Sequence, residues 1–142
     1  MARSSTRRRG RIGAVAAALL VLLPLAGCAG PTPYSDFERE RTEADVLPEA
    51  GGIDTGIDPE SVRFVGTAEG VDVYIGLSDE RGRCVVVDDG ADSASGCSGS
   101  GGLETSKPGA WTVRVHPDGE GPEDAPGLDW TALGENVSVR AG

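Results

Sequence analysis

Apolar and polar residues alternate along several short stretches of the chain from residue 61 onward, and this period of two is that of a β-strand. The stretch VDVYIGL shows it most clearly, because its aliphatic residues all fall on one face: Val71, Val73, Ile75 and Leu77. RCVVVD is apolar on both faces, which predicts a central strand. Strands are expected at residues 61–67, 71–77, 83–88, 93–97, 111–116 and 136–140, with Gly, Asp and Pro in the turns.

The end of the chain follows the same alternation. In WTVRVH the bulky apolar residues are expected to point inward and the others outward: Thr112, Arg114 and His116. A brief helical turn is expected at residues 130–133, before the last strand. The pattern predicts a mainly β fold, a small antiparallel sheet or meander of five to six short strands. One face of this twisted sheet would be covered by the N-terminal segment or by the turn around Trp130.

The first 27 residues have a different pattern. Five arginines and no acid occupy residues 1–11, and an apolar run follows from Ile12 to Leu25, in the order of a secretory signal peptide. The run contains Pro24 and is shorter than the ~20 residues that a membrane-spanning helix needs. General secretion fits better than twin-arginine export, because the residues after the paired arginines match that signal poorly.

This apolar run ends on Leu25, Ala26, Gly27 and Cys28, which resembles the lipobox of bacterial lipoproteins. The resemblance implies that the Cys28 sulfur receives a diacylglyceryl group and that the signal is cleaved before it. Acyl chains would then hold the protein on the extracytoplasmic face of the cell membrane. The alternative is an unprocessed cysteine in an ordinary secretory signal. With its CVVV strand and Gly/Ser-rich CSGSGG stretch, the chain is similar to small lipoproteins of high-GC Gram-positive bacteria, a resemblance that implies no activity.

Removal of the signal changes the charge of the chain. Eight basic and 23 acidic residues remain, which is a formal charge of −15. Such a chain is repelled by nucleic acid and by anionic lipid, so nucleic acid is not an expected partner. The length allows one small domain. We expect a signal peptide at residues 1–27, an acidic Pro/Gly-rich tether at 28–57 and a small β domain at 58–142.

One local element stands out in the tether. Ser35 and Glu38 have the spacing of a capping box, which predicts a short helix that ends before Pro48. Its apolar face is poor, so the helix is expected to be either marginal or docked on the sheet through Phe37.

Two cysteines remain once Cys28 carries a lipid, and Cys84 and Cys97 form an even pair. Export makes a disulfide possible, and the predicted strand, turn and strand bring the two residues together. The bond would stabilise so small a domain by roughly 3 kcal/mol in the loop-entropy account. Two cysteines and one histidine do not assemble a zinc-type ligand set, so no metal or cofactor is expected.

No catalytic motif is complete. In the CSGSGG loop, Ser98 and Ser100 each lack one of the glycines of G-x-S-x-G. His116 comes at a strand end before a turn and is expected to be exposed. The acidic turns at residues 88–92 and 120–124 leave weak calcium binding as a minor alternative.

The expected function is therefore a membrane-anchored binding or interaction module at the cell envelope, with an envelope protein or a glycan as partner. The expected contact surface combines the loop of Ser98 and Ser100 with Trp130. Trp130 has a second interpretation, as a plug at the end of the sheet. The alternative function is a small extracytoplasmic hydrolase that would use His116, an aspartate and a serine of the CSGSGG loop.

Overall fold

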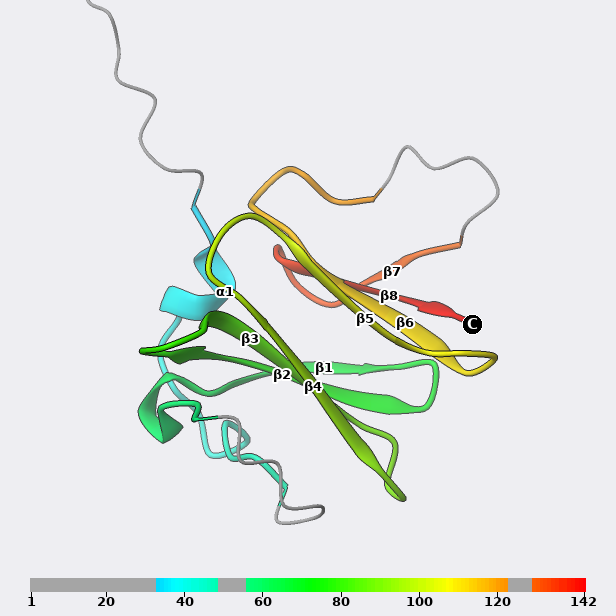
Figure 1. Ribbon diagram of the computed structural model, residues 1–142, viewed down its shortest axis with the longest axis horizontal. Helices are drawn as coiled ribbons and strands as arrows, with labels where there is room; N and C mark the ends of the chain where they lie inside the picture. The colour runs from blue at the N-terminus through cyan, green and yellow to red at the C-terminus, as the bar shows by residue number, and fades with distance from the viewer. Residues whose placement is uncertain (1–32, 49–55, 123–128) are drawn as a thin grey trace, which may run out of the picture.

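Two antiparallel four-stranded sheets pack face to face in the computed structural model, which describes residues 33–48, 56–122 and 129–142 (Figure 1). The first sheet has the order β1-β2-β3-β4 and the second the order β5-β6-β8-β7. The first contains β1 (Arg63–Ala68), β2 (Val71–Ser78), β3 (Gly82–Asp88) and β4 (Ser93–Ser98). The second contains β5 (Leu103–Lys107), β6 (Trp111–Val115), β7 (Thr131–Ala132) and β8 (Val137–Ala141).

Valines from both sheets fill the space between them. Their β-branched side chains suit a pleated, buried surface. The first sheet contributes Val71, Val73, Ile75, Val85 and Val87, and the second contributes Trp111, Val113, Val115, Val137 and Val139. The expected central position of β3 is confirmed, since it lies between β2 and β4 with Cys84 to Val87 buried.

The predicted mainly β, antiparallel fold is confirmed, and all six expected strands are present. Two further strands divide the chain into two sheets instead of one. β5 (LETSK) has too few apolar residues for its sequence to predict a strand. It forms a strand by antiparallel backbone pairing with β6. The helical turn expected around Trp130 is wrong, because Thr131 and Ala132 form β7 by pairing with β8. Leu77 falls on the same face of β2 as the core residues, but it is 42 % exposed, because it comes two residues after Ile75, the last core residue of that strand.

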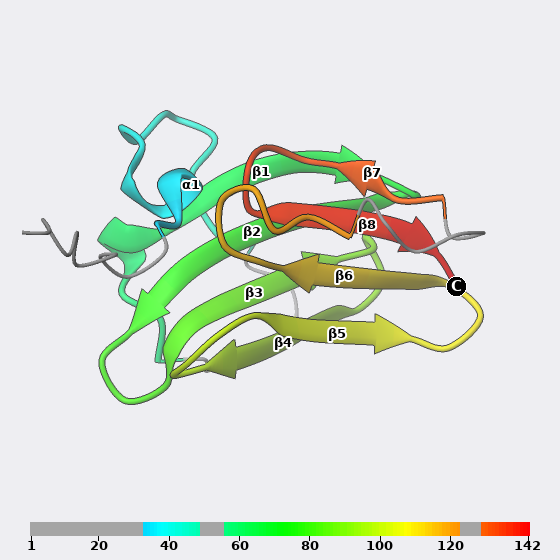
Figure 2. The same cartoon turned by 90° about the horizontal axis from the view of Figure 1, so that it is seen from above.

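The N-terminal segment from residue 33 to residue 48 lies against one end of the two sheets (Figures 1 and 2). It contains the helix α1 (Ser35–Glu38), and Tyr34 and Phe37 are buried in the common core. The docked alternative, through Phe37, therefore holds for α1. The expected capping box does not form: the N-cap is Tyr34, and the Ser35 hydroxyl binds Asp118 Oδ1 at 3.2 Å instead.

A buried ion pair fixes the rest of this segment. Asp45 is 0 % exposed and accepts hydrogen bonds from Arg39, from Thr42 and from the backbone N–H of Phe64 in β1. Arg39 also donates to the Phe64 carbonyl oxygen at 2.8 Å. These bonds hold the pKa of the Asp45 carboxyl well below its usual range, the Arg39 side chain being the main cause and burial opposing it. A short 3-10 turn, η1 (Pro59–Ser61), then leads into β1.

The predicted Cys84–Cys97 disulfide is confirmed. The two residues face each other on β3 and β4, with their Cα atoms 4.0 Å apart. Since this pair comes from adjacent strands, the bond fixes the β3–β4 hairpin itself. None of the helices in the described part of the chain is long and apolar enough to cross a membrane.

Candidate binding site

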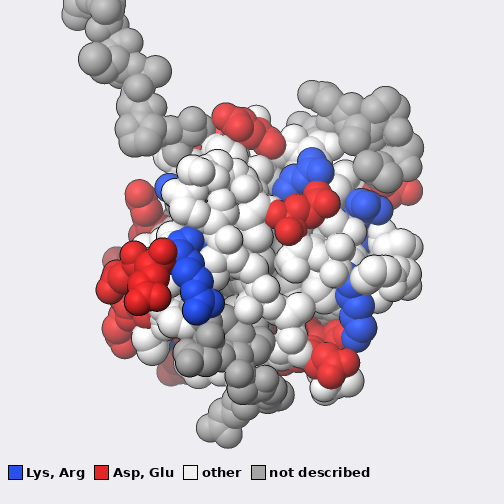
Figure 3. Space-filling model, viewed as in Figure 1, with Lys and Arg blue, Asp and Glu red and all other residues white. Residues whose placement is uncertain are grey.

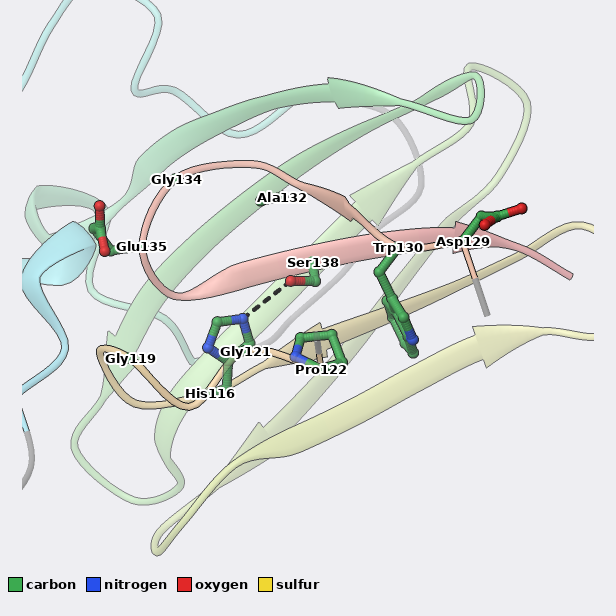
Figure 4. Close-up of a pocket in the computed structure, with 10 residues that line it drawn as sticks. All are labelled: His116, Gly119, Gly121, Pro122, Asp129, Trp130, Ala132, Gly134, Glu135 and Ser138. Carbon is green, nitrogen blue, oxygen red and sulfur yellow. Dashed lines mark hydrogen bonds between the residues drawn. The ribbon is translucent and has the colours of Figure 1, made fainter. Parts of the chain in front are cut away.

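A pocket of about 660 Å³ lies on the outer face of the second sheet, on the side away from the core (Figure 4). Its floor comes from His116, directly after β6, and from the outward residue Ser138 of β8, and its rim from the segments that precede β7 and connect β7 to β8. The pocket is lined by His116, Gly119, Gly121, Pro122, Asp129, Trp130, Ala132, Gly134, Glu135 and Ser138.

The floor of the pocket carries a histidine–serine pair. His116 Nε2 lies 3.1 Å from Ser138 Oγ, and His116 Nδ1 lies 3.1 Å from the Pro117 carbonyl oxygen. Because a carbonyl oxygen only accepts, Nδ1 carries the proton in the neutral ring and Nε2 accepts from the serine hydroxyl. The expected exposure of His116 is wrong: it is 7 % exposed, and Ser138 is 3 % exposed. Gly119, Gly121 and Pro122, which follow β6, line the same pocket as this pair (Figure 4).

Asn136 ties the rim of the pocket to the N-terminal segment. Its amide nitrogen donates to the His116 carbonyl at 3.0 Å and to Asp118 Oδ1 at 2.6 Å. Its side-chain oxygen accepts from the Asp36 N–H, and its own backbone N–H donates to Asp36 Oδ2, both at 2.8 Å. Gly134 makes this approach possible, because it has a φ of 104° and a Cβ there would lie 2.6 Å from Asp36 Oδ2.

Trp130 forms the wall at the other end of the pocket. Its ring centroid lies 5.0 Å from the guanidinium carbon of Arg114 and 5.3 Å from that of Arg140, within the range of cation–π attraction. Arg114 also pairs with Glu104 at 2.7 Å. Trp130 Nε1 and Arg140 Nε, like Trp111 Nε1 in the core, are buried nitrogens without a hydrogen-bond partner within the described residues.

The charges around the pocket are mixed in sign. Glu135 stands near α1 and Asp129 beside Trp130, at opposite ends of the site (Figure 4). The pKa of Asp118 is lowered, first by the hydrogen bond from the Ser35 N–H and then by that from Asn136. On the face seen in Figure 3, acidic and basic side chains likewise lie beside one another rather than in one patch.

The described residues contain no group of three or more His, Cys, Asp or Glu that could hold a metal ion. In the acidic turn at residues 88–92, Asp89 pairs with Lys107 at 2.6 Å, and this hydrogen bond is the main reason that its pKa falls to about 2. In the second acidic turn, Glu123 and Asp124 lie outside the described part of the chain.

The other predicted site residues lie elsewhere. Ser98 ends β4, and its hydroxyl donates to the Ser100 carbonyl at 2.8 Å. Neither serine lines the pocket that contains Trp130 and His116, so the structure does not bring the expected contact residues together. Cys28 lies outside the described residues.

Sequence reasoning missed the partners of Trp130 and His116. Arg114 and Ser138 both stand at outward positions of their strands, and they face each other in the β6–β8 ladder. An antiparallel alignment of WTVRVH with NVSVR places Arg114 opposite Ser138. A meander of the predicted strands makes these two strands neighbours, but their register was not predicted, because about twenty residues separate them in the sequence.

The fold and the pocket define a small, disulfide-bonded β-sandwich with a polar site on the outer face of one sheet. No family model, curated protein or solved structure matches the chain. The proposals that follow therefore rest on its own residues.

Proposed function

We propose that this chain is a cell-envelope lipoprotein, anchored through Cys28 on the extracytoplasmic face of the membrane, and that its sandwich is a binding module. The anchor is supported by the order of charged, apolar and LAGC segments at the start of the chain. The Cys84–Cys97 disulfide is also in keeping with an oxidising, exported environment.

The observation that carries the binding proposal is the outer-face pocket with Trp130 as its wall. Ligand sites are concave, few in number and combine apolar or aromatic surface with a few polar groups. Here the Trp130 indole and the Asp129 carboxylate stand at one end of the pocket, the Glu135 carboxylate lies at the other, and the His116 imidazole lies between them (Figure 4). A flat apolar surface next to hydrogen-bond acceptors suits a sugar, which has C–H faces and hydroxyl donors. We therefore propose an envelope glycan as the ligand.

Titration with soluble oligosaccharides from the envelope, measured by isothermal titration calorimetry, tests the glycan proposal. The Trp130→Ala protein should lose at least tenfold in affinity and unfold in urea close to the wild type. Leu77→Ala, which removes an exposed apolar side chain on the other sheet, is the matched control and should bind normally. Unchanged affinity of Trp130→Ala would refute the site.

The anchor is tested separately. The wild-type protein should partition into membranes and carry the mass of a diacylglyceryl group at Cys28, and Cys28→Ser should abolish both. A mature protein of unmodified mass in the soluble fraction would refute the anchor and leave the pocket proposal standing.

One observation favours a second function, a small hydrolase: the hydrogen bond between His116 Nε2 and Ser138 Oγ. In an ester cleavage, Oγ would attack the carbonyl carbon and pass its proton to Nε2, which would then protonate the leaving alkoxide. Water would release the acyl group from Ser138 in the second half of the cycle. Ser138 is 3 % exposed, so the substrate would have to displace part of the rim. Ester turnover that vanishes in both Ser138→Ala and His116→Ala would establish this function, and its absence in the wild type would exclude it.

A further inference from the structure

The distance along the chain between the anchor and the folded domain is short. Pro33, the first described residue, comes only five residues after Cys28. Whatever the conformation between them, five residues span at most ~18 Å. The docked segment begins at once: the Pro33 carbonyl accepts from the Asp118 N–H at 3.0 Å, and the Tyr34 hydroxyl donates to the Gly101 carbonyl at 2.9 Å.

These contacts all lie at one end of the sandwich, which we call the anchor end. It comprises α1, the β2–β3 turn at residues 79–81, the β4–β5 loop at 99–102 and the segment that follows β6 (Figures 1 and 2). Arg83 at the start of β3 stacks on the Tyr34 ring, 3.7 Å from its centroid. These contacts prevent the domain from swinging freely about residue 33.

The opposite end, which we call the far end, carries the other turns. These are the β1–β2, β3–β4 and β5–β6 turns, at residues 69–70, 89–92 and 108–110. Both views in Figures 1 and 2 place them away from α1. Since β2 has eight residues, the far end lies ~26 Å beyond the anchor end along the strands.

We propose that the anchor end faces the lipid headgroup layer and that the far end points away from the membrane. This inference rests on the proposed lipid anchor at Cys28. If the domain were turned over, with its far end on the lipid, Pro33 would lie ~26 Å from the membrane surface. The tether reaches at most ~18 Å, so this orientation is excluded. The net charge of −15 keeps the acidic domain from lying flat on anionic lipid, but the short tether limits how far it can stand away.

The orientation decides which surfaces a partner can reach. Ser98 and Ser100 directly precede Gly101, whose carbonyl binds the Tyr34 hydroxyl at the anchor end. Their loop therefore lies in the narrow space between the domain and the lipid. A bulky envelope partner would therefore approach the far end or the side of the sandwich, where the pocket with Trp130 opens.

Cysteine accessibility on right-side-out membrane vesicles tests the orientation. Ser100→Cys reports the anchor end and Ala91→Cys the far end, and both residues are exposed. Cys84 and Cys97 are bonded to each other, and an acylated Cys28 has no thiol, so each variant has one reactive cysteine. We expect a bulky polymer-linked maleimide to modify Ser100→Cys several-fold more slowly than Ala91→Cys. A small maleimide should modify both at similar rates.

A longer tether is the matched control. About twenty Gly/Ser residues inserted after Cys28 would add an r.m.s. span of ~25 Å and should equalise the two rates with the bulky reagent. Equal rates without the insertion, in a protein that remains in the membrane, would overturn the orientation alone. A protein that is absent from the membrane would instead refute the anchor on which the inference rests.

Discussion

Replacing Asp45 with Ala removes the most heavily bonded buried carboxylate among the described residues. Asp45 accepts two hydrogen bonds from Arg39, at 2.5 and 2.9 Å, and two from Thr42. A fifth comes from the Phe64 N–H at 2.7 Å. The substitution leaves this N–H and the Arg39 charge without their partner, while the cavity itself is small.

The expected loss of stability follows from these contacts. Removing one partner of a buried ion pair costs ~3–5 kcal/mol. Arg39 is 32 % exposed, so water compensates part of its charge and the lower end of that range applies. We expect Asp45→Ala to lower the free energy of unfolding by about 3 kcal/mol, measured by urea unfolding of the lipid-free protein at pH 7.

The same segment offers a control. Glu60 pairs with Arg41 at 2.9 Å, but its side chain is 81 % exposed, so Glu60→Ala should cost less than about 1 kcal/mol. The pH dependence gives a second check. The lowered pKa of Asp45 in the folded state stabilises the protein above pH ~4, the unfolded value, and this contribution disappears as the pH falls further. Asp45→Asn should therefore lose less stability below pH 4 than the wild type. Equal costs for Asp45→Ala and Glu60→Ala would refute the reasoning.

Three further predictions concern other parts of the fold. Reduction of the Cys84–Cys97 disulfide should lower the unfolding free energy by roughly 3 kcal/mol, measured in urea with and without a reductant. Phe37→Ala should cost about 3 kcal/mol by the same assay, whereas a freely hanging segment would lose nothing. Lys107→Met should raise the pKa of Asp89 from about 2 toward its ordinary value, as followed by NMR titration, and an unchanged pKa would contradict the ion pair.

Alternation along the chain predicted four of the strands, a run that is apolar on both faces predicted β3, and the return of Cys97 towards Cys84 predicted β4. The even pair of cysteines predicted the disulfide. These patterns were not enough to predict two sheets. β5 is mostly polar and β7 has only two residues, so both depend on pairing with strands already in place. Local sequence carries no information on such pairing.

The candidate site was harder to predict for the same reason. Trp130 was identified as a candidate, but its neighbours Arg114 and Arg140 come from two strands that only the folded sheet brings together. His116 was expected to be exposed, because a polar residue at a strand end before a turn usually is. The structure instead buries it in the pocket, where Gly119, Gly121 and Pro122 of the following segment are among the lining residues.

The contacts of Arg39 and Asp45 with Phe64 have a consequence for the edge of the first sheet. β1 is an edge strand of the first sheet, and an unpaired edge is a template for pairing with another chain. At Phe64, the N–H is taken by the Asp45 carboxylate and the carbonyl by the Arg39 guanidinium. The two side chains thus occupy the places that the backbone of an incoming strand would use. A second copy of the chain therefore cannot extend the first sheet at Phe64 with a strand of its own.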